Sequence, residues 1–92
     1  MQITIRGKRW QLRFCRLQNN LGECDSPATK SKQIRISNRI RDERLLDVLI
    51  HEGLHACHWD LDEEAVDRSA KDLARMLWRL GYRRNTDCSE DA

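Results

Sequence analysis

The sequence has few of the features that define several large classes of protein. Its 92 residues include one Pro and four Gly, and 39% of them are hydrophobic, which excludes a collagen-like chain and argues against a disordered one. No apolar run approaches the ~20 residues that a membrane span needs, and the first ten residues, MQITIRGKRW, lack the apolar core of a signal peptide. We therefore expect a single cytoplasmic domain that makes no membrane contact.

Cysteine is present, but not in a pattern that predicts a zinc ribbon or a disulfide framework. The four cysteines, Cys15, Cys24, Cys57 and Cys88, are widely spread and form no C-x-x-C pair. In a reducing cytoplasm we expect all four to be free thiols.

The net charge of +2 conceals a difference between the two halves of the chain. Residues 1–44 hold eleven Lys or Arg against four Asp or Glu, a balance of +7, and residues 45–92 hold six against eleven, a balance of −5. This division can attract the halves to each other or present a basic face to an acidic partner. The basic side chains that we consider for contacts with nucleic acid are Lys8, Arg9, Arg13 and Arg16.

Alternating apolar and polar residues predict strands in the first part of the chain. The stretch QITIRGKRWQLRF, residues 2–14, alternates on both sides of Gly7 and predicts a hairpin with Trp10 in the core. Residues 18–32 are rich in turn-forming residues and are predicted to form a loop. KQIRIS, residues 32–37, predicts a third strand, so we expect a small, three-stranded, mainly antiparallel sheet.

The apolar period then changes to that of a helix. Ser37 or Asn38 is the expected cap, and the helical stripe continues to about His58. Gly53 lies inside this helix, where it costs up to ~1 kcal/mol relative to Ala, and we expect a closely packed neighbour to explain it.

A second helix is predicted to follow directly. Asp60 and Glu63 have the spacing of a capping box, and the helix should end near Gly81. Its expected buried stripe is formed by Val66, Ala70, Leu73, Leu77 and Leu80. The sequence thus predicts an α+β domain over residues 1–81, a sheet followed by two packed helices, with a polar, flexible tail at 82–92.

The first predicted helix carries the motif H-E-x-x-H. Its residues are His51, Glu52 and His55, with Gly53 and Leu54 between them. Two His one turn apart can bind one zinc ion, and the Glu beside the first can act as general base on a zinc-bound water. The motif therefore predicts a zinc site, with Glu52 as the catalytic residue.

A catalytic zinc ion needs a third protein ligand. His58 lies ~10 Å along the helix axis from His51, so it cannot readily join a ligand shell shared with His55, and we expect it in a cleft or on the surface. On the second helix Glu63 faces inward, with Asp67 one turn later on the same edge. We therefore favour Glu63 as the ligand and Asp67 as the acceptor of the non-coordinating N–H of a zinc-bound His. The alternatives are Glu64, Asp60, Asp62 and water.

The sequence KQIRIS, the helix with LIHEGLHA and the acidic helix DEEAVDRSAKDLARML together resemble the minimal core of the zincin metallopeptidases, in the style of SprT-like and ImmA/IrrE-type domains. The chain is also similar to small metallopeptidase-like proteins encoded by bacteriophages, which would place it in the bacterial host cytoplasm. The resemblance implies His51, His55 and Glu63 as zinc ligands and Glu52 as base. In the gluzincins, the zincins whose third zinc ligand is a downstream Glu, we expect a longer connection than the seven residues between His55 and Glu63.

Two functions follow as hypotheses. The first is a zinc-dependent peptidase, in which KQIRIS holds an extended peptide by β-augmentation and the oxyanion is stabilised by His58, Tyr82 or one of the Arg residues. The second is a non-catalytic zinc-containing module that binds nucleic acid or a protein partner through the basic hairpin.

Overall fold

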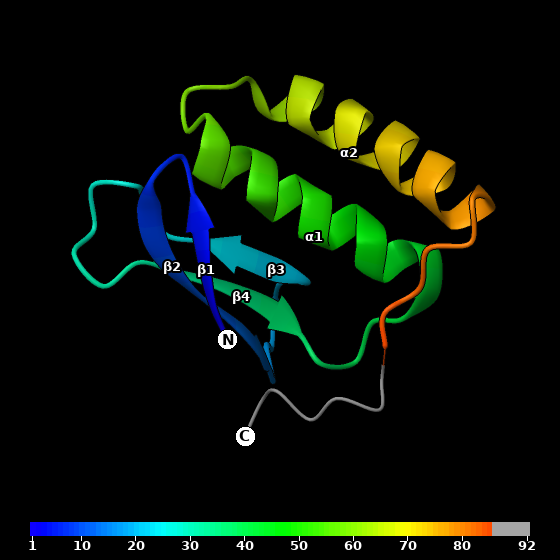
Figure 1. The fold of residues 1–92 in the computed structure, drawn as a ribbon, viewed down its shortest axis with the longest axis horizontal. Helices are drawn as coiled ribbons and strands as arrows, with labels where there is room; N and C mark the ends of the chain where they lie inside the picture. The colour runs from blue at the N-terminus through cyan, green and yellow to red at the C-terminus, as the bar shows by residue number, and fades with distance from the viewer. Residues whose placement is uncertain (86–92) are drawn as a thin grey trace.

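The computed structural model describes residues 1–85 of the chain, so the predictions for Cys88 and for the flexibility of residues 86–92 lie outside the described residues. Four strands precede two helices along the chain (Figure 1). The strands are β1 (Gln2–Ile5), β2 (Lys8–Cys15), β3 (Gly22–Cys24) and β4 (Gln33–Ser37), and the helices are α1 (Asp42–Cys57) and α2 (Glu63–Arg79).

The predicted hairpin is confirmed. β1 and β2 pair antiparallel, with Ile5 opposite Lys8. The two turn residues, Arg6 and Gly7, have φ angles of 51° and 77°. Two-residue hairpin turns whose twist matches that of the strands, those of type I′, need positive φ at both positions. Gly7 adopts this conformation without the steric cost that Arg6 bears.

The α+β class is confirmed, but the sheet differs from the prediction in size and direction. It has four strands in the order β1-β2-β4-β3, and β2 and β4 run parallel. The additional strand, β3, lies within the predicted loop and pairs antiparallel with β4. With three residues, one of them Gly, β3 is too short to show an alternating pattern.

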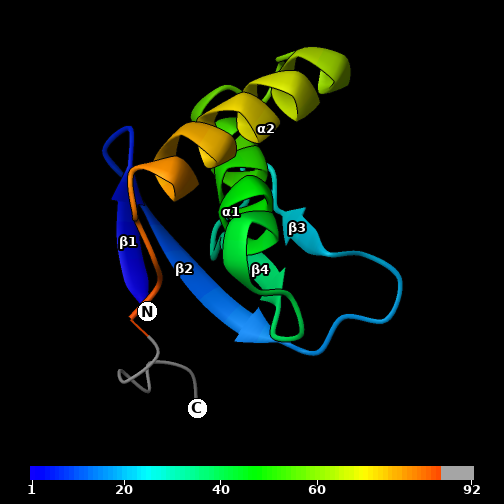
Figure 2. The same cartoon turned by 90° about the vertical axis from the view of Figure 1, so that its right-hand side faces the viewer.

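One face of the sheet forms the core with α1. Trp10, Ile34 and Ile36 are buried on this face together with Leu45 and Ala56 of α1, so the prediction for Trp10 is confirmed. α2 packs on the opposite side of α1, and Figures 1 and 2 show α1 between the sheet and α2. No helix of the described residues is long and apolar enough to cross a membrane.

Both helices begin with caps other than those predicted. Arg41 precedes α1 without a side-chain cap, whereas Ser37 belongs to β4 and Asn38 to the following turn. The capping box of Asp60 and Glu63 is also wrong. Asp62 caps α2 instead, because its carboxylate accepts a hydrogen bond from the backbone N–H of Ala65.

The end of α2 is as predicted. Gly81 has a φ of 97° and donates its N–H to the carbonyl of Trp78, and Tyr82 donates to that of Leu77. This is the Schellman arrangement, in which a left-handed Gly satisfies the last carbonyls of a helix.

The predicted buried stripe of α2 is only partly correct. Val66 and Ala70 are buried, but Leu73 and Leu80 are 39% and 69% exposed. Ala74 is buried in their place. The contact with α1 follows a spacing of four residues and uses small side chains, which let two helices approach closely, rather than the largest apolar ones.

Gly53 has no closely packed neighbour. Apart from the backbone of the same helix nearby, a Cβ at Gly53 would meet no atom within 4 Å. The prediction that packing explains this Gly is therefore wrong.

Candidate metal centre

The two helices bring His51, His55 and Glu63 together. His51 and His55 lie one turn apart on α1, and Glu63 is the first residue of α2, directly after its cap Asp62. The Glu63 carboxylate bridges the imidazoles, since Oε1 lies 2.9 Å from Nε2 of His51 and Oε2 lies 3.0 Å from Nε2 of His55. One ligand atom from each residue lies within 4.8 Å of the other two, so the group can hold a metal ion.

The other candidate ligands do not join this group, which is the one set of possible ligands found among residues 1–85. Glu64 forms a salt bridge of 2.7 Å with Arg68 on the exposed side of α2. Asp62 is occupied as the helix cap. His58 is exposed just beyond α1, where its backbone N–H donates to the carbonyl of Leu54.

Glu52 is the buried acid of the motif. It is 8% exposed, and burial raises the pKa of its carboxyl group, an effect that the neighbouring His51 and His55 oppose. A carboxylate with a raised pKa exchanges protons nearer to neutral pH, which suits a general base.

A groove of about 270 Å³ runs beside the metal-binding group. Its walls include Glu52 and His51 of α1, Gly22 at the start of β3, and Asp67 and Lys71 of α2. A Cβ at Gly22 would lie 2.7 Å from Cγ1 of Val48 and 2.9 Å from Cγ of Glu52, so only Gly fits there without displacement. β3 therefore passes directly against the motif Glu.

The strand at the rim of the groove is not the one predicted. β4, which contains most of KQIRIS, lies between β2 and β3, and both its edges are already paired. The edge strand beside the groove is β3, at the end of the sheet away from β1, so the assignment of β-augmentation to KQIRIS is wrong. β3 could not be found from the sequence, although Gly22 at its start and Asp25 directly after it are residue types that often mark special backbone conformations.

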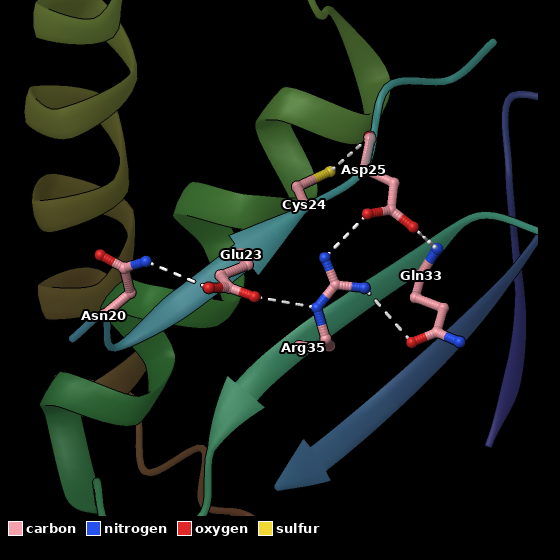
Figure 3. A network of polar contacts seen from close by, with 6 residues as sticks. All are labelled: Asn20, Glu23, Cys24, Asp25, Gln33 and Arg35. Atoms are coloured by element: carbon pink, nitrogen blue, oxygen red, sulfur yellow. Dashed lines mark hydrogen bonds and ion pairs between the residues drawn. The ribbon is translucent and has the colours of Figure 1, made fainter. Parts of the chain in front are cut away.

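Arg35 holds β3 in place, a role that sequence reasoning missed. Its guanidinium lies 2.9 Å from the Glu23 carboxylate and 2.8 Å from that of Asp25 (Figure 3). The second oxygen of Asp25 accepts a hydrogen bond from the backbone N–H of Gln33. These charged hydrogen bonds lower the pKa values of Glu23 and Asp25 and fasten β3 to the middle of the sheet.

Asp67, one turn after Glu63 on α2, lines the groove. Its carboxylate accepts a hydrogen bond of 2.9 Å from Nζ of Lys71, which lowers the pKa of Asp67. Lys71 also lies 3.9 Å from Asp47 of α1. A hydrogen bond from a metal-bound imidazole to Asp67 stays a prediction.

Tyr82 is not a candidate for the oxyanion donor. It follows the C-terminal end of α2, whereas Glu63 begins this helix of 17 residues, so the two are separated by about 25 Å of helix. His58 stays a candidate, and Trp59 beside it contacts His55, with their ring centroids 6.1 Å apart.

The three cysteines among residues 1–85 add no ligand to the group. Cys15, Cys24 and Cys57 are free. Burial raises the pKa of the Cys24 thiol to about 12, so this residue stays protonated and is a weak ligand and nucleophile near neutral pH.

The four basic residues considered for contacts with nucleic acid lie on β2 or directly after it. Arg9 and Arg13 of β2 are exposed and alternate with the core residues Trp10, Leu12 and Phe14, so they stand on the face of the sheet opposite α1. Lys8 is exposed beside the hairpin turn, and Arg16 follows the end of β2.

The donor set of two imidazoles and one carboxylate is one that catalytic zinc sites use, and it leaves a position open for water. Comparisons of the chain with family models, with curated proteins and with solved structures find no match. The functional argument therefore depends on the geometry of this site.

Proposed function

We propose that this protein is a zinc-dependent metallopeptidase whose metal ligands are His51, His55 and Glu63 and whose general base is Glu52. The observation that carries the proposal is the Glu63 carboxylate placed between the Nε2 atoms of both motif His residues. The Glu63 side chain is 69% exposed, so water alone could solvate its carboxylate without the two imidazoles. A single metal ion would bind this carboxylate and both imidazoles at once.

The residues of the site divide the chemistry between them. Zinc, when bound, lowers the pKa of a coordinated water toward ~7 and polarises a carbonyl group. Glu52 accepts the proton of the attacking water and passes it to the amine that leaves. Its burial beside Gly22 fixes the carboxylate, which a general base requires.

The free edge of β3 supports a peptide or protein as substrate. An extended peptide can pair with an exposed strand edge through backbone hydrogen bonds, and β3 begins at the groove that contains Glu52, where Gly22 forms part of the wall. A peptide paired there lies beside the general base. A cytoplasmic location and a bacteriophage origin belong to the same proposal and depend on the resemblance to small zincins.

The test compares Glu52→Gln with the wild-type protein. We expect Glu52→Gln to bind about one zinc ion per chain and to lose cleavage of a mixed pool of fluorogenic peptides. The matched control is Glu43→Gln in the first turn of the same helix, which should keep both properties. A wild-type protein that is folded but binds no zinc, or a Glu52→Gln variant that cleaves at the wild-type rate, would overturn the proposal.

A second candidate function is a metal-containing module that binds nucleic acid. The observation that favours it is the exposure of Arg9 and Arg13 on the open face of the sheet, where neither forms a salt bridge with any residue from 1 to 85. Arg35, by contrast, is paired with Glu23 and Asp25. The two candidates are compatible, since they use opposite sides of the domain.

A further inference from the structure

A cavity of about 840 Å³ lies at the beginning of α1, apart from the residues of the metal-binding group. Small-molecule sites in proteins typically have volumes of about 300–1,000 Å³, so the cavity is of the size that holds a ligand. Its walls come from the loop before α1, from α1 itself and from the end of α2 with the residues that follow it.

The inner wall of this cavity is apolar. Leu46 and Leu49 of α1 face Leu77 and Trp78 of α2, and all four are only half-buried. A ligand that covers apolar surface otherwise in contact with water binds more tightly as the covered area grows. The wall therefore favours a ligand with an apolar body.

Positive charge also lines the cavity. Arg41, Arg83 and Arg84 contribute to its walls, and Asp42 is the one acid among the lining residues of the described part of the chain; Arg84 also stacks 3.8 Å from the centre of the Phe14 ring. The guanidinium of Arg83 stacks 3.1 Å from the centre of the Trp78 ring and donates to the carbonyls of Trp78 and Tyr82, so its position is fixed. The positive end of the α1 dipole adds to this field.

Arg41 is separated from the leucines of the cavity wall along α1. Arg41 precedes the helix and Leu49 lies eight residues later, about 12 Å along the axis.

Residues 86–92, TDCSEDA, carry acids that match the arginines, but their only apolar members are Cys88 and Ala92. They therefore match the charge of the cavity and not its leucine wall.

We propose that this cavity binds an amphipathic anion, a single alkyl chain with a carboxylate head. The chain lies along Leu46, Leu49 and Leu77, and the carboxylate meets the arginines. The site is independent of the metal-binding group and of the peptidase proposal.

The experiment measures binding of octanoate, decanoate and dodecanoate to the full chain by calorimetry, below the concentrations at which these chains form micelles. We expect saturable binding of one molecule per chain, with affinity rising about fourfold for each added methylene. Decanol, which lacks the charge, should bind at least fivefold more weakly than decanoate. Arg41→Gln should remove that difference, whereas Arg39→Gln, an exposed neighbour outside the cavity, should preserve it.

Several results would overturn the proposal. One is the absence of saturable binding, and another is equal affinity for dodecanoate and for dodecyltrimethylammonium. Equal effects of Arg41→Gln and Arg39→Gln would show that binding follows net charge alone. A peptide of sequence TDCSEDA that binds as tightly as dodecanoate would show that the leucine wall contributes nothing.

Discussion

Gly22 of β3 and Glu52 of α1 are packed so closely that a Cβ on the Gly would lie 2.9 Å from Cγ and 3.0 Å from Oε2 of the Glu. The proposed general base is therefore positioned by the edge strand and by its own helix together. Any side chain at position 22 must push the carboxylate or the strand away.

Gly22→Ala should consequently reduce peptide cleavage while it preserves the affinity for zinc. The added methyl group overpacks a filled space, which typically costs about 1–3 kcal/mol, and displaces Glu52. A misplacement of about 1 Å in a catalytic group can lower the rate ~100-fold. Peptidase assays, chelator competition for zinc and urea unfolding would measure the three effects. Unchanged cleavage would show that Gly22 does not position the base.

Gly53→Ala is the matched control within the motif itself. A Cβ there meets no atom within 4 Å in the space around the helix. Ala favours the interior of a helix over Gly by about 0.5–1 kcal/mol, so this variant should be more stable than the wild type by about that amount. Urea unfolding of the metal-free protein would measure the difference, and a loss of stability would show a contact at Gly53 that forms in solution.

The third metal ligand can be tested with two adjacent residues. Glu63→Gln should weaken zinc binding by more than the roughly 10–100-fold that the loss of an outer contact costs, because it removes a ligand from the metal. Glu64→Gln, which removes only the exposed salt bridge to Arg68, should leave zinc affinity unchanged. Competition with a zinc chelator gives both values. The reverse order of effects would assign the ligand to Glu64.

The alternation in β1 and β2, the motif in α1 and the inward side of Glu63 were all predictable, because each depends on a local period that the sequence shows directly. The position of β3 was not, since three residues carry no period and their pairing depends on Arg35, Glu23 and Asp25 from separate segments. The register of α2 on α1 also escaped prediction, because Ala70 and Ala74 pack where larger residues were expected. Local signals thus located the residues that can hold a metal ion, and long-range contacts determined how the groove is closed.

The Arg35 network should make stability depend on pH in the acidic range. Arg35 lowers the pKa values of Asp25 and Glu23 from their ordinary 3.8 and 4.5, so the unfolded chain binds more protons than the folded one. The contribution is complete above about pH 4.5 and is lost as the pH falls through the lowered values. Because Glu23 is 37% exposed, we expect Arg35→Gln to cost only about 1 kcal/mol at pH 7.

Urea unfolding at pH 7 and at pH 2.5 would test this. The difference in stability between wild type and Arg35→Gln should shrink at the lower pH. Arg13→Gln, on the neighbouring strand and opposite Arg35 in register, should show no such dependence. An equal difference at both pH values would mean that Arg35 acts through packing and not through its charge.

The open face of the sheet offers the last test, which separates a nucleic-acid-binding module from a peptidase alone. If Arg9 and Arg13 contact phosphates, single-stranded DNA should bind, and the logarithm of its affinity should fall linearly with that of the salt concentration. Replacing both Arg residues with Gln should reduce this slope by about 1.4, because each phosphate contact on a single strand contributes about 0.7. Fluorescence anisotropy at several salt concentrations gives the slope. The control is a double variant of Arg68 and Arg75 on exposed positions of α2, which removes the same net charge. If both double variants reduced the salt-dependence slope equally, DNA would be attracted to the protein's overall charge and not to a site on the sheet.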